Sequence, residues 1–192
     1  MDKNNVFNLI ISGVGGQGLI TLLQVIDESA LIENYDIKSS ELHGLSQRGG
    51  SVLTHIRFGK KVYSPMVLKG EADLIIGMEL TESLRATIFA GKNTIFLVNN
   101  NHIAFDNNFS KEEAIKQINE IDKKNLHLVE GSEICKQKLG KDVLAGMYLL
   151  GYTVYKNLIP LKKESIIKAI ERVIPENFRE INIKALTLIY DN

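Results

Sequence analysis

Hydrophobic residues along the chain form short continuous runs that alternate with stripes of helical spacing. Residues 6–11 are almost entirely apolar and lead into a glycine-rich turn, as expected for a central parallel strand covered on both faces. In residues 19–32 the apolar positions recur on one side, which predicts an amphipathic helix. The chain therefore begins with a strand, a glycine loop and a helix.

The same reasoning predicts further strands and helices up to residue 140. The alternation of residues 52–58 indicates a strand, and Gly59-Lys60 is expected to turn the chain into a hairpin that reaches residue 63. Ser110 and Glu113 form a capping-box pattern that opens a helix. The remaining expected elements are a short strand at 36–39, buried strands in "ADLIIGM" and "NTIFLVN", a strand in "LHLVE", and helices over 81–89, 110–121 and after a Ser132 cap.

The last third of the sequence is expected to be helical. Residues 143–155 carry no charge and are apolar on all sides, which predicts a helix buried in its own core or against a partner. Residues 166–173 show a clean apolar stripe, whereas residues 181–190 fit a helix or a strand. The prediction is a single α/β domain over residues 1–192, with a Rossmann-like, mostly parallel sheet, helices on both faces, a hairpin near 52–63 and a helical C-terminal third.

Composition and charge narrow the possible functions. The chain has 192 residues, 44% hydrophobic and 24% charged, and its 23 basic residues balance 23 acidic ones. This balance gives no support for nucleic acid or an anionic membrane as a partner. The apolar stretch near the N-terminus is too short for a signal peptide, and the longest uncharged run is too short to span a bilayer, so a cytoplasmic protein is expected.

Cysteine chemistry is limited to one residue, Cys135. A single thiol cannot form an intramolecular disulfide, hold an iron–sulfur cluster or build a cysteine-rich zinc site. We expect Cys135 to be a buried structural thiol.

The first glycine loop is a candidate phosphate site. Gly13, Gly15 and Gly18 fit G-x-G-x-x-G between strand and helix, where backbone N–H groups and a helix N-terminus favour an anion. The alternative is that the glycines only allow close packing of the helix on the strand. No Lys-Ser or Lys-Thr follows Gly18, which excludes an ATP-type P-loop. A ribose-binding acid is also missing, because Asp36 comes too early and Glu41 too late, which argues against NAD.

A second stretch, "SSELHGLSQRGGS" over residues 39–51, is expected at the carboxyl end of the sheet, beside the first loop. Arg48 can hold a phosphate or carboxylate through two parallel hydrogen bonds, or contact another subunit. His43 is a possible catalytic group that can titrate near neutrality. The alternative for His43 is a structured turn whose polar groups bind its own backbone or another subunit.

The two loops together carry a resemblance to a known family. "SGVGGQGLIT" followed by "SSELHGLSQRGGSV" resembles the gamma-type domain of the 2-oxoacid:ferredoxin oxidoreductases, most closely the stand-alone beta subunit of the indolepyruvate enzymes. The resemblance includes "EADLIIGMEL" and the helical end with "LIP", and it covers nearly the whole chain.

The resemblance implies a subunit that is inactive alone. The family decarboxylates a 2-oxoacid, joins the acyl group to coenzyme A and passes electrons to ferredoxin. A large alpha subunit is expected to bring thiamine diphosphate, magnesium and iron–sulfur clusters, since this chain has one cysteine and no Gly-Asp-Gly segment. Coenzyme A contact in the complex, or contact with the partner's active site, is then expected at these residues: Gly13, Gly15, Gly16, Gln17, Gly18, Ser46, Gln47, Arg48 and Gly49.

Two function hypotheses follow. The first is an obligate subunit that helps form the coenzyme A and substrate region of an indolepyruvate- or aryl pyruvate-oxidising enzyme. The second is a free-standing Rossmann module that binds a nucleotide, such as a redox sensor or an NAD-dependent protein. The absence of a ribose acid and of an independent catalytic set favours the first hypothesis.

Overall fold

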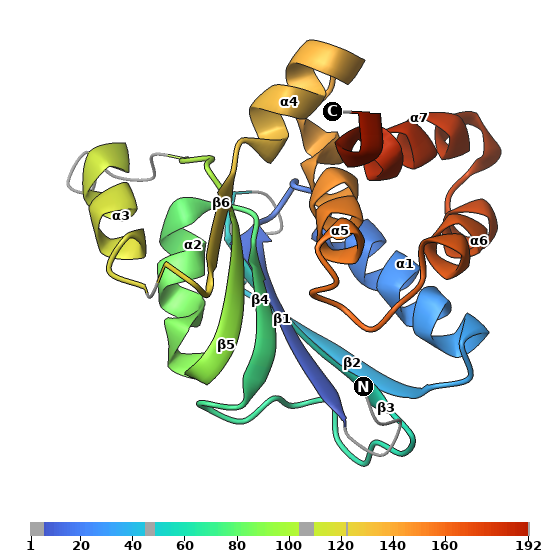
Figure 1. The fold of residues 1–192 in the computed structure, drawn as a ribbon, viewed down its shortest axis with the longest axis horizontal. Coiled ribbons are helices and arrows are strands. Elements are labelled where there is room, and N and C mark those ends of the chain that lie inside the picture. The colour runs from blue at the N-terminus through green and yellow to red at the C-terminus, as the bar shows by residue number, and fades with distance from the viewer. Residues whose placement is uncertain (1–5, 45–48, 104–109, 122, 192) are drawn as a thin grey trace.

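The computed structural model describes residues 6–44, 49–103, 110–121 and 123–191. Within these residues, six strands form one sheet with helices on both faces (Figure 1). The order across the sheet is β2-β3-β1-β4-β5-β6. The strands are β1 (Phe7–Val14), β2 (Asp36–His43), β3 (Ser51–Gly59), β4 (Ala72–Gly77), β5 (Ala90–Asn99) and β6 (Leu126–Val129).

Most of the sheet is parallel, as predicted. β1, β4, β5 and β6 run in the same direction. The exception is β3, which is antiparallel to both β1 and β2 and lies between them. The carboxyl ends of β1 and β2 therefore meet the start of β3 at one edge of the sheet, where both glycine-bearing loops leave it.

The predicted hairpin near 52–63 is wrong in its second arm. β3 forms a hairpin with the preceding strand β2, and no strand follows Gly59 until β4. Two backbone N–H groups of the following segment bind side chains instead of a neighbouring strand: Val62 donates to Asp36 Oδ2 at 2.8 Å and Val67 to His55 Nδ1 at 3.2 Å. Side chains thus satisfy this segment where a strand ladder was expected.

The helices form two layers with separate apolar cores. One core joins α1, α5, α6 and α7 to one face of the sheet, and the other joins α2 and α3 to the opposite face (Figure 1). The helices are α1 (Leu19–Ile32), α2 (Leu80–Arg85), α3 (Lys111–Ile118), α4 (Gly131–Leu139), α5 (Ala145–Tyr155), α6 (Lys163–Val173) and α7 (Glu176–Thr187), with 3₁₀ turns at Ala86–Phe89, Asp142–Leu144 and Leu188–Asp191.

The uncharged helix α5 is buried in the chain's own core. Gly146 and Gly151 lie on its buried surface. At Gly151 the backbone of Leu186 comes so close that an added Cβ would overlap its carbonyl oxygen. The small residues in this segment therefore allow α5 to cross the C-terminal helix at close range.

Two predicted helix ends are wrong, and the structure decides between helix and strand for residues 181–190. Ser132 does not cap α4, because Glu130 is the residue before the helix; Ser132 instead exchanges hydrogen bonds with Asn99. The helix from Ser110 ends at Ile118, before the predicted Ile121, although its capping box is confirmed. Residues 181–190, which fitted a helix or a strand, are helical.

Among the described residues, none of the helices combines the length and the apolar character needed to cross a membrane.

Candidate functional site

The two glycine-bearing loops lie against each other at the carboxyl end of β1. The Gly15 N–H donates to the Gly50 carbonyl at 2.8 Å, and the Gly49 N–H donates to the Gly15 carbonyl at 3.1 Å. The predicted placement of the second loop beside the first is therefore confirmed. Ser46, Gln47 and Arg48 lie outside the described residues, so their predicted ligand contacts stay predictions.

The glycines of the first loop have two different roles: one allows close packing, and another lies beside open space. A Cβ on Gly13 would lie 2.8 Å from both Met78 Cβ and Gln17 Oε1, so this glycine permits close packing. Gly16 has a φ of 105° and Gly18 a φ of 79°, in the left-handed region that glycine favours. An added Cβ on Gly16 would meet no atom within 4 Å, so open space lies beside this part of the loop.

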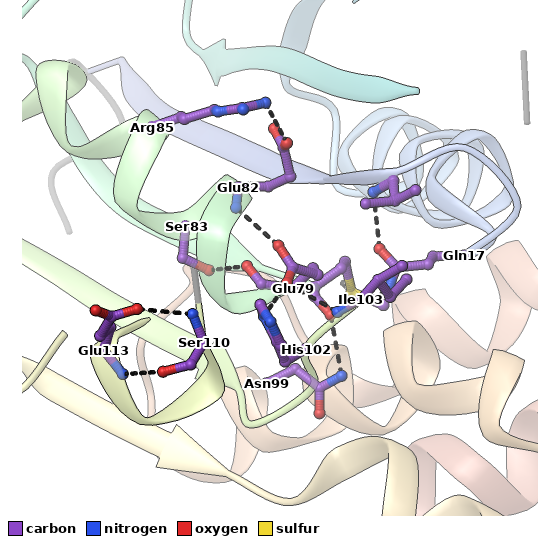
Figure 2. A network of polar contacts seen from close by, with 12 residues as sticks. Gln17, Glu79, Glu82, Ser83, Arg85, Asn99, His102, Ile103, Ser110 and Glu113 are labelled. Atoms are coloured by element: carbon purple, nitrogen blue, oxygen red, sulfur yellow. Dashed lines mark hydrogen bonds and ion pairs between the residues drawn. The ribbon is translucent and has the colours of Figure 1, made fainter. Parts of the chain in front are cut away.

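Gln17 is held inside the loop by both ends of its amide. Its Oε1 accepts the Val14 N–H at 2.8 Å, and its Nε2 donates to the Met78 carbonyl at 3.2 Å (Figure 2). Its own backbone N–H donates back to the Val14 carbonyl at 3.1 Å. Gln17 thus shapes the loop, and the ligand contact expected of it stays a prediction.

The N-terminus of α1 opens next to these glycines. Gly18 is the residue before the helix and offers no side-chain cap, and the first helical bond runs from Leu22 N–H to Gly18 O at 3.0 Å. The N–H groups of the first turn consequently have no acceptor within the helix, and the turn carries no acidic side chain. Such a terminus attracts an anion through its N–H groups and the helix dipole.

A cavity of about 440 Å³ lies at this terminus. A second hollow of about 260 Å³ shares Gly18 and Thr21 with it and extends between α1, α5 and α7. The lining of the first cavity is Gly15, Gly16, Gly18, Leu19, Ile20, Thr21, Glu41, His43 and Val52. The two hollows therefore adjoin each other at Gly18 and Thr21, beside the N-terminus of α1.

His43 and Glu41 line this cavity from the end of β2. The exposed imidazole of His43 has its Nδ1 2.9 Å from the carbonyl of Gly44, the next residue. This contact agrees with the turn-forming alternative, and a catalytic role for His43 stays a prediction. Glu41 belongs to the strand, not to the loop, and β3 separates its strand from β1.

A buried polar network, which the sequence analysis missed, lies beside the loops at the start of α2 (Figure 2). The fully buried Glu79 carboxylate accepts the N–H groups of Glu82 at 2.9 Å and Ile103 at 3.1 Å, and it lies 3.2 Å from His102 Nδ1. The available signal was an acidic residue directly after the buried strand in "LIIGMEL", since a charge at that place needs partners.

Comparison with known proteins places this fold. The family described as pyruvate ferredoxin/flavodoxin oxidoreductase matches residues 8–192. The chain belongs to this family. The indolepyruvate oxidoreductase subunit IorB of Pyrococcus horikoshii is 31% identical over 188 residues, which cover 95% of this chain and 93% of the relative. IorB of Methanothermobacter thermautotrophicus is 31% identical over 185 residues, with 93% of each chain covered.

Two solved structures share the fold of this chain. A keto/oxoacid ferredoxin oxidoreductase gamma subunit from Geobacter sulfurreducens has a TM-score of 0.70 at 19% identity, with 96% of each chain covered. The 2-oxoglutarate:ferredoxin oxidoreductase of Magnetococcus marinus, described with 2-oxoglutarate, coenzyme A and succinyl-CoA bound, has a TM-score of 0.72 at 12% identity. The match covers 98% of this chain and 31% of that longer one.

The described part of the chain contains no group of three or more His, Cys, Asp or Glu side chains that could hold a metal ion. Cys135 is fully buried, and burial, assisted by the nearby Asp142, raises the pKa of its thiol from 9.0 to about 12. The expectation that this thiol is buried is confirmed.

Proposed function

We propose that this chain is the single-domain gamma-type subunit of an indolepyruvate-type 2-oxoacid:ferredoxin oxidoreductase, and that its paired loops receive the phosphate end of coenzyme A. The similarity to IorB subunits supports the subunit role. The observation that carries the ligand assignment is the open N-terminus of α1 beside Gly16 and Gly18, within a cavity of about 440 Å³.

The residues fit coenzyme A but not the other cofactors of such an enzyme. A diphosphate can take hydrogen bonds from the N–H groups of the first turn of α1 without an opposing acidic side chain in that turn. The lone buried thiol cannot hold an iron–sulfur cluster. We therefore assign thiamine diphosphate, magnesium and the clusters to a large alpha subunit, which would also deliver electrons to ferredoxin.

The remaining parts of a long cofactor can occupy the two hollows on either side of Gly18. The second hollow is lined mainly by apolar side chains, with Lys141 among its lining residues and the Lys141 ammonium 5.7 Å from the centre of the Phe178 ring. An apolar chain or a base fits such walls, and an ammonium fits a phosphate. Coenzyme A supplies the thiol that accepts the acyl group, and this chain orients it toward the partner's active site.

Ile20 offers a sharp test because it lies in the first turn of α1, lines the cavity and is 55% exposed. Ile20→Glu places a negative charge where a phosphate would bind, and the same charge favours the helix N-terminus itself. In the complex reconstituted with the large subunit, we expect the KM for coenzyme A to rise about tenfold or more, because like charges in contact cost on the order of 1–2 kcal/mol.

Two controls isolate the charge and the phosphates. The glutamine of Ile20→Gln has nearly the same size as the glutamate of Ile20→Glu but carries no charge. The KM of Ile20→Gln for coenzyme A should therefore stay close to that of the wild type. Pantetheine has the thiol but no phosphates, so Ile20→Glu should leave its kinetics unchanged. An equal KM for coenzyme A in Ile20→Glu and Ile20→Gln, with assembly intact by analytical ultracentrifugation, would refute the phosphate assignment.

The subunit assignment has its own test. Purified alone, the chain should not reduce a viologen dye with indolepyruvate and coenzyme A, since the described residues offer no cluster or metal site. Anaerobic mixing with the large subunit should restore turnover. Dye reduction by the lone chain would support the free-standing redox module instead.

A further inference from the structure

The segment that links β4 to α2, together with the first turn of α2, contacts both glycine-bearing loops. The Met78 carbonyl accepts a hydrogen bond from Gln17 Nε2 of the first loop at 3.2 Å. Glu82 Oε2 accepts a hydrogen bond from Ser51 Oγ, at the end of the second loop, at 2.5 Å. One short segment, residues 78–82, thus holds both loops.

Ser51 occupies the place where the second loop re-enters the sheet. It is the first residue of β3 and pairs with Val14, the last residue of β1. The residue before it, Gly50, accepts the Gly15 N–H through its carbonyl at 2.8 Å. Fixing the Ser51 side chain therefore fixes the backbone that joins the two loops.

Glu82 is well suited to hold Ser51. Its carboxylate is 3% exposed, its Oε1 accepts from Arg85 Nη1 at 2.7 Å, and its N–H donates to Glu79 Oε2 at 2.9 Å (Figure 2). Both carboxylate oxygens thus have donors, and a charged acceptor makes a stronger hydrogen bond than a neutral one. A buried carboxylate adds little to stability on its own, because its desolvation cost offsets the attraction of its partners.

We propose that Glu82 is a positioning residue for the coenzyme A loops and acts through Ser51. Neither side chain lines the cavity, so their effect on a ligand is indirect. The inference rests on the proposed function: if the cavity receives coenzyme A, the Glu82–Ser51 hydrogen bond sets the distance between its two walls.

The test compares Ser51→Ala with Ser110→Ala. Ser110 is also a serine whose hydroxyl makes a hydrogen bond to a glutamate residue. In the capping box of α3, its Oγ accepts the backbone N–H of Glu113 at 3.2 Å. In the reconstituted complex we expect Ser51→Ala to raise the KM for coenzyme A about five- to tenfold, with kcat little changed. This is less than the roughly 10- to 100-fold of a charge-assisted hydrogen bond lost directly to the ligand, because Ser51 acts only through the loop. Ser110→Ala should leave both constants unchanged.

Two further measurements keep the inference independent of stability and of the proposed function. Ser51→Thr retains the hydroxyl and should restore the KM to within about twofold of the wild type. Hydrogen exchange of the complex should show faster exchange at the Gly15 and Gly49 amides in Ser51→Ala than in Ser110→Ala.

The possible outcomes separate the two proposals. An unchanged KM and unchanged exchange in Ser51→Ala would overturn the positioning role of Glu82. If Ile20→Glu leaves the KM for coenzyme A unchanged while Ser51→Ala still speeds exchange at Gly15 and Gly49, the proposed function fails and the loop-positioning role stands. A raised KM in both Ser51→Ala and Ser51→Thr would also contradict the inference, because the hydroxyl is then not the cause.

Discussion

The side chain of Gln17 donates a hydrogen bond to the Met78 carbonyl at 3.2 Å and so joins the glycine loop to the chain that follows β4. Asn99 Nδ2, at the end of β5, donates to the same carbonyl at 3.1 Å. The glycine loop is therefore connected through one oxygen atom to the ends of two further parallel strands.

Gln17→Ala should loosen the loop. It removes the acceptor of the Val14 N–H and one donor of the Met78 carbonyl, and each lost bond typically costs about 1 kcal/mol. We expect the free energy of unfolding to fall by about 1–2 kcal/mol in urea titrations, with a higher KM for coenzyme A.

Gln17→Glu separates the two bonds of this residue. A carboxylate still accepts from Val14 but cannot donate to the Met78 carbonyl. Its second oxygen would face the Met78 carbonyl oxygen with no proton between them, and this repulsion offsets the bond that is kept. We therefore expect Gln17→Glu to be no more stable than Gln17→Ala. A variant as stable as the wild type would show that the bond to Met78 adds nothing.

The elements that the sequence predicted well are those with local signals. The run before Gly13, the apolar stripe of residues 19–32 and the Ser110–Glu113 box each carry their signal within one segment. The pairing of β3 with β2 was missed because it depends on long-range register. Two partners of the Glu79 carboxylate, His102 and the Ile103 N–H, come from residues after β5. The site was therefore only partly predictable: both loops were identified, but the network beneath them was not.

Gly151→Ala should destabilise the protein because α5 crosses the C-terminal helix with no room for a side chain. Relief of the overlap with the Leu186 carbonyl needs a backbone shift, which typically costs about 1–3 kcal/mol or more. Gly146→Ala on the same helix is the matched control, because its new Cβ would lie 3.5 Å from Leu22 Cδ2, an ordinary contact. Thermal unfolding should show a lower Tm for Gly151→Ala and an equal or higher Tm for Gly146→Ala.

The carboxyl group of Asp27 makes stability depend on pH. Burial raises its pKa from the ordinary 3.8, and the hydrogen bond from Ser39 Oγ at 2.6 Å opposes that rise only in part. The folded state therefore holds this proton more tightly than the unfolded state, so the contribution of Asp27 to stability falls as pH rises from 3.8 through its raised pKa.

Asp27→Asn removes this dependence. Relative to the wild type, the free energy of unfolding of Asp27→Asn should improve as pH rises from the ordinary carboxyl value of 3.8 through the raised pKa of Asp27. Urea titrations at several pH values give this difference directly. A difference that stays constant or shrinks with rising pH would mean that Asp27 is not protonated more readily in the fold.

Cys135 should be unreactive in the folded protein. Its thiol is fully buried and has a pKa of about 12, so the thiolate is scarce at pH 8. Labelling with Ellman's reagent should be slow in buffer and should accelerate with urea in step with the loss of circular dichroism. Fast labelling without denaturant would show that α4 opens on its own.

The antiparallel direction of β3 makes the second loop the turn of a hairpin, held at its base by the pairing of His43 with Val52. A turn of this kind can change in length and sequence without altering the register of the strands that carry it. Gly49, Gly50 and Ser51 hold the first loop and are thus fixed, as is the first loop itself through the packing of Gly13 against Met78. The freedom to vary is therefore confined to the part of the second loop that precedes Gly49. Loop grafts between relatives that use different oxoacids should therefore be made between residues 43 and 49, which leaves the contacts of Gly49, Gly50 and Ser51 in place.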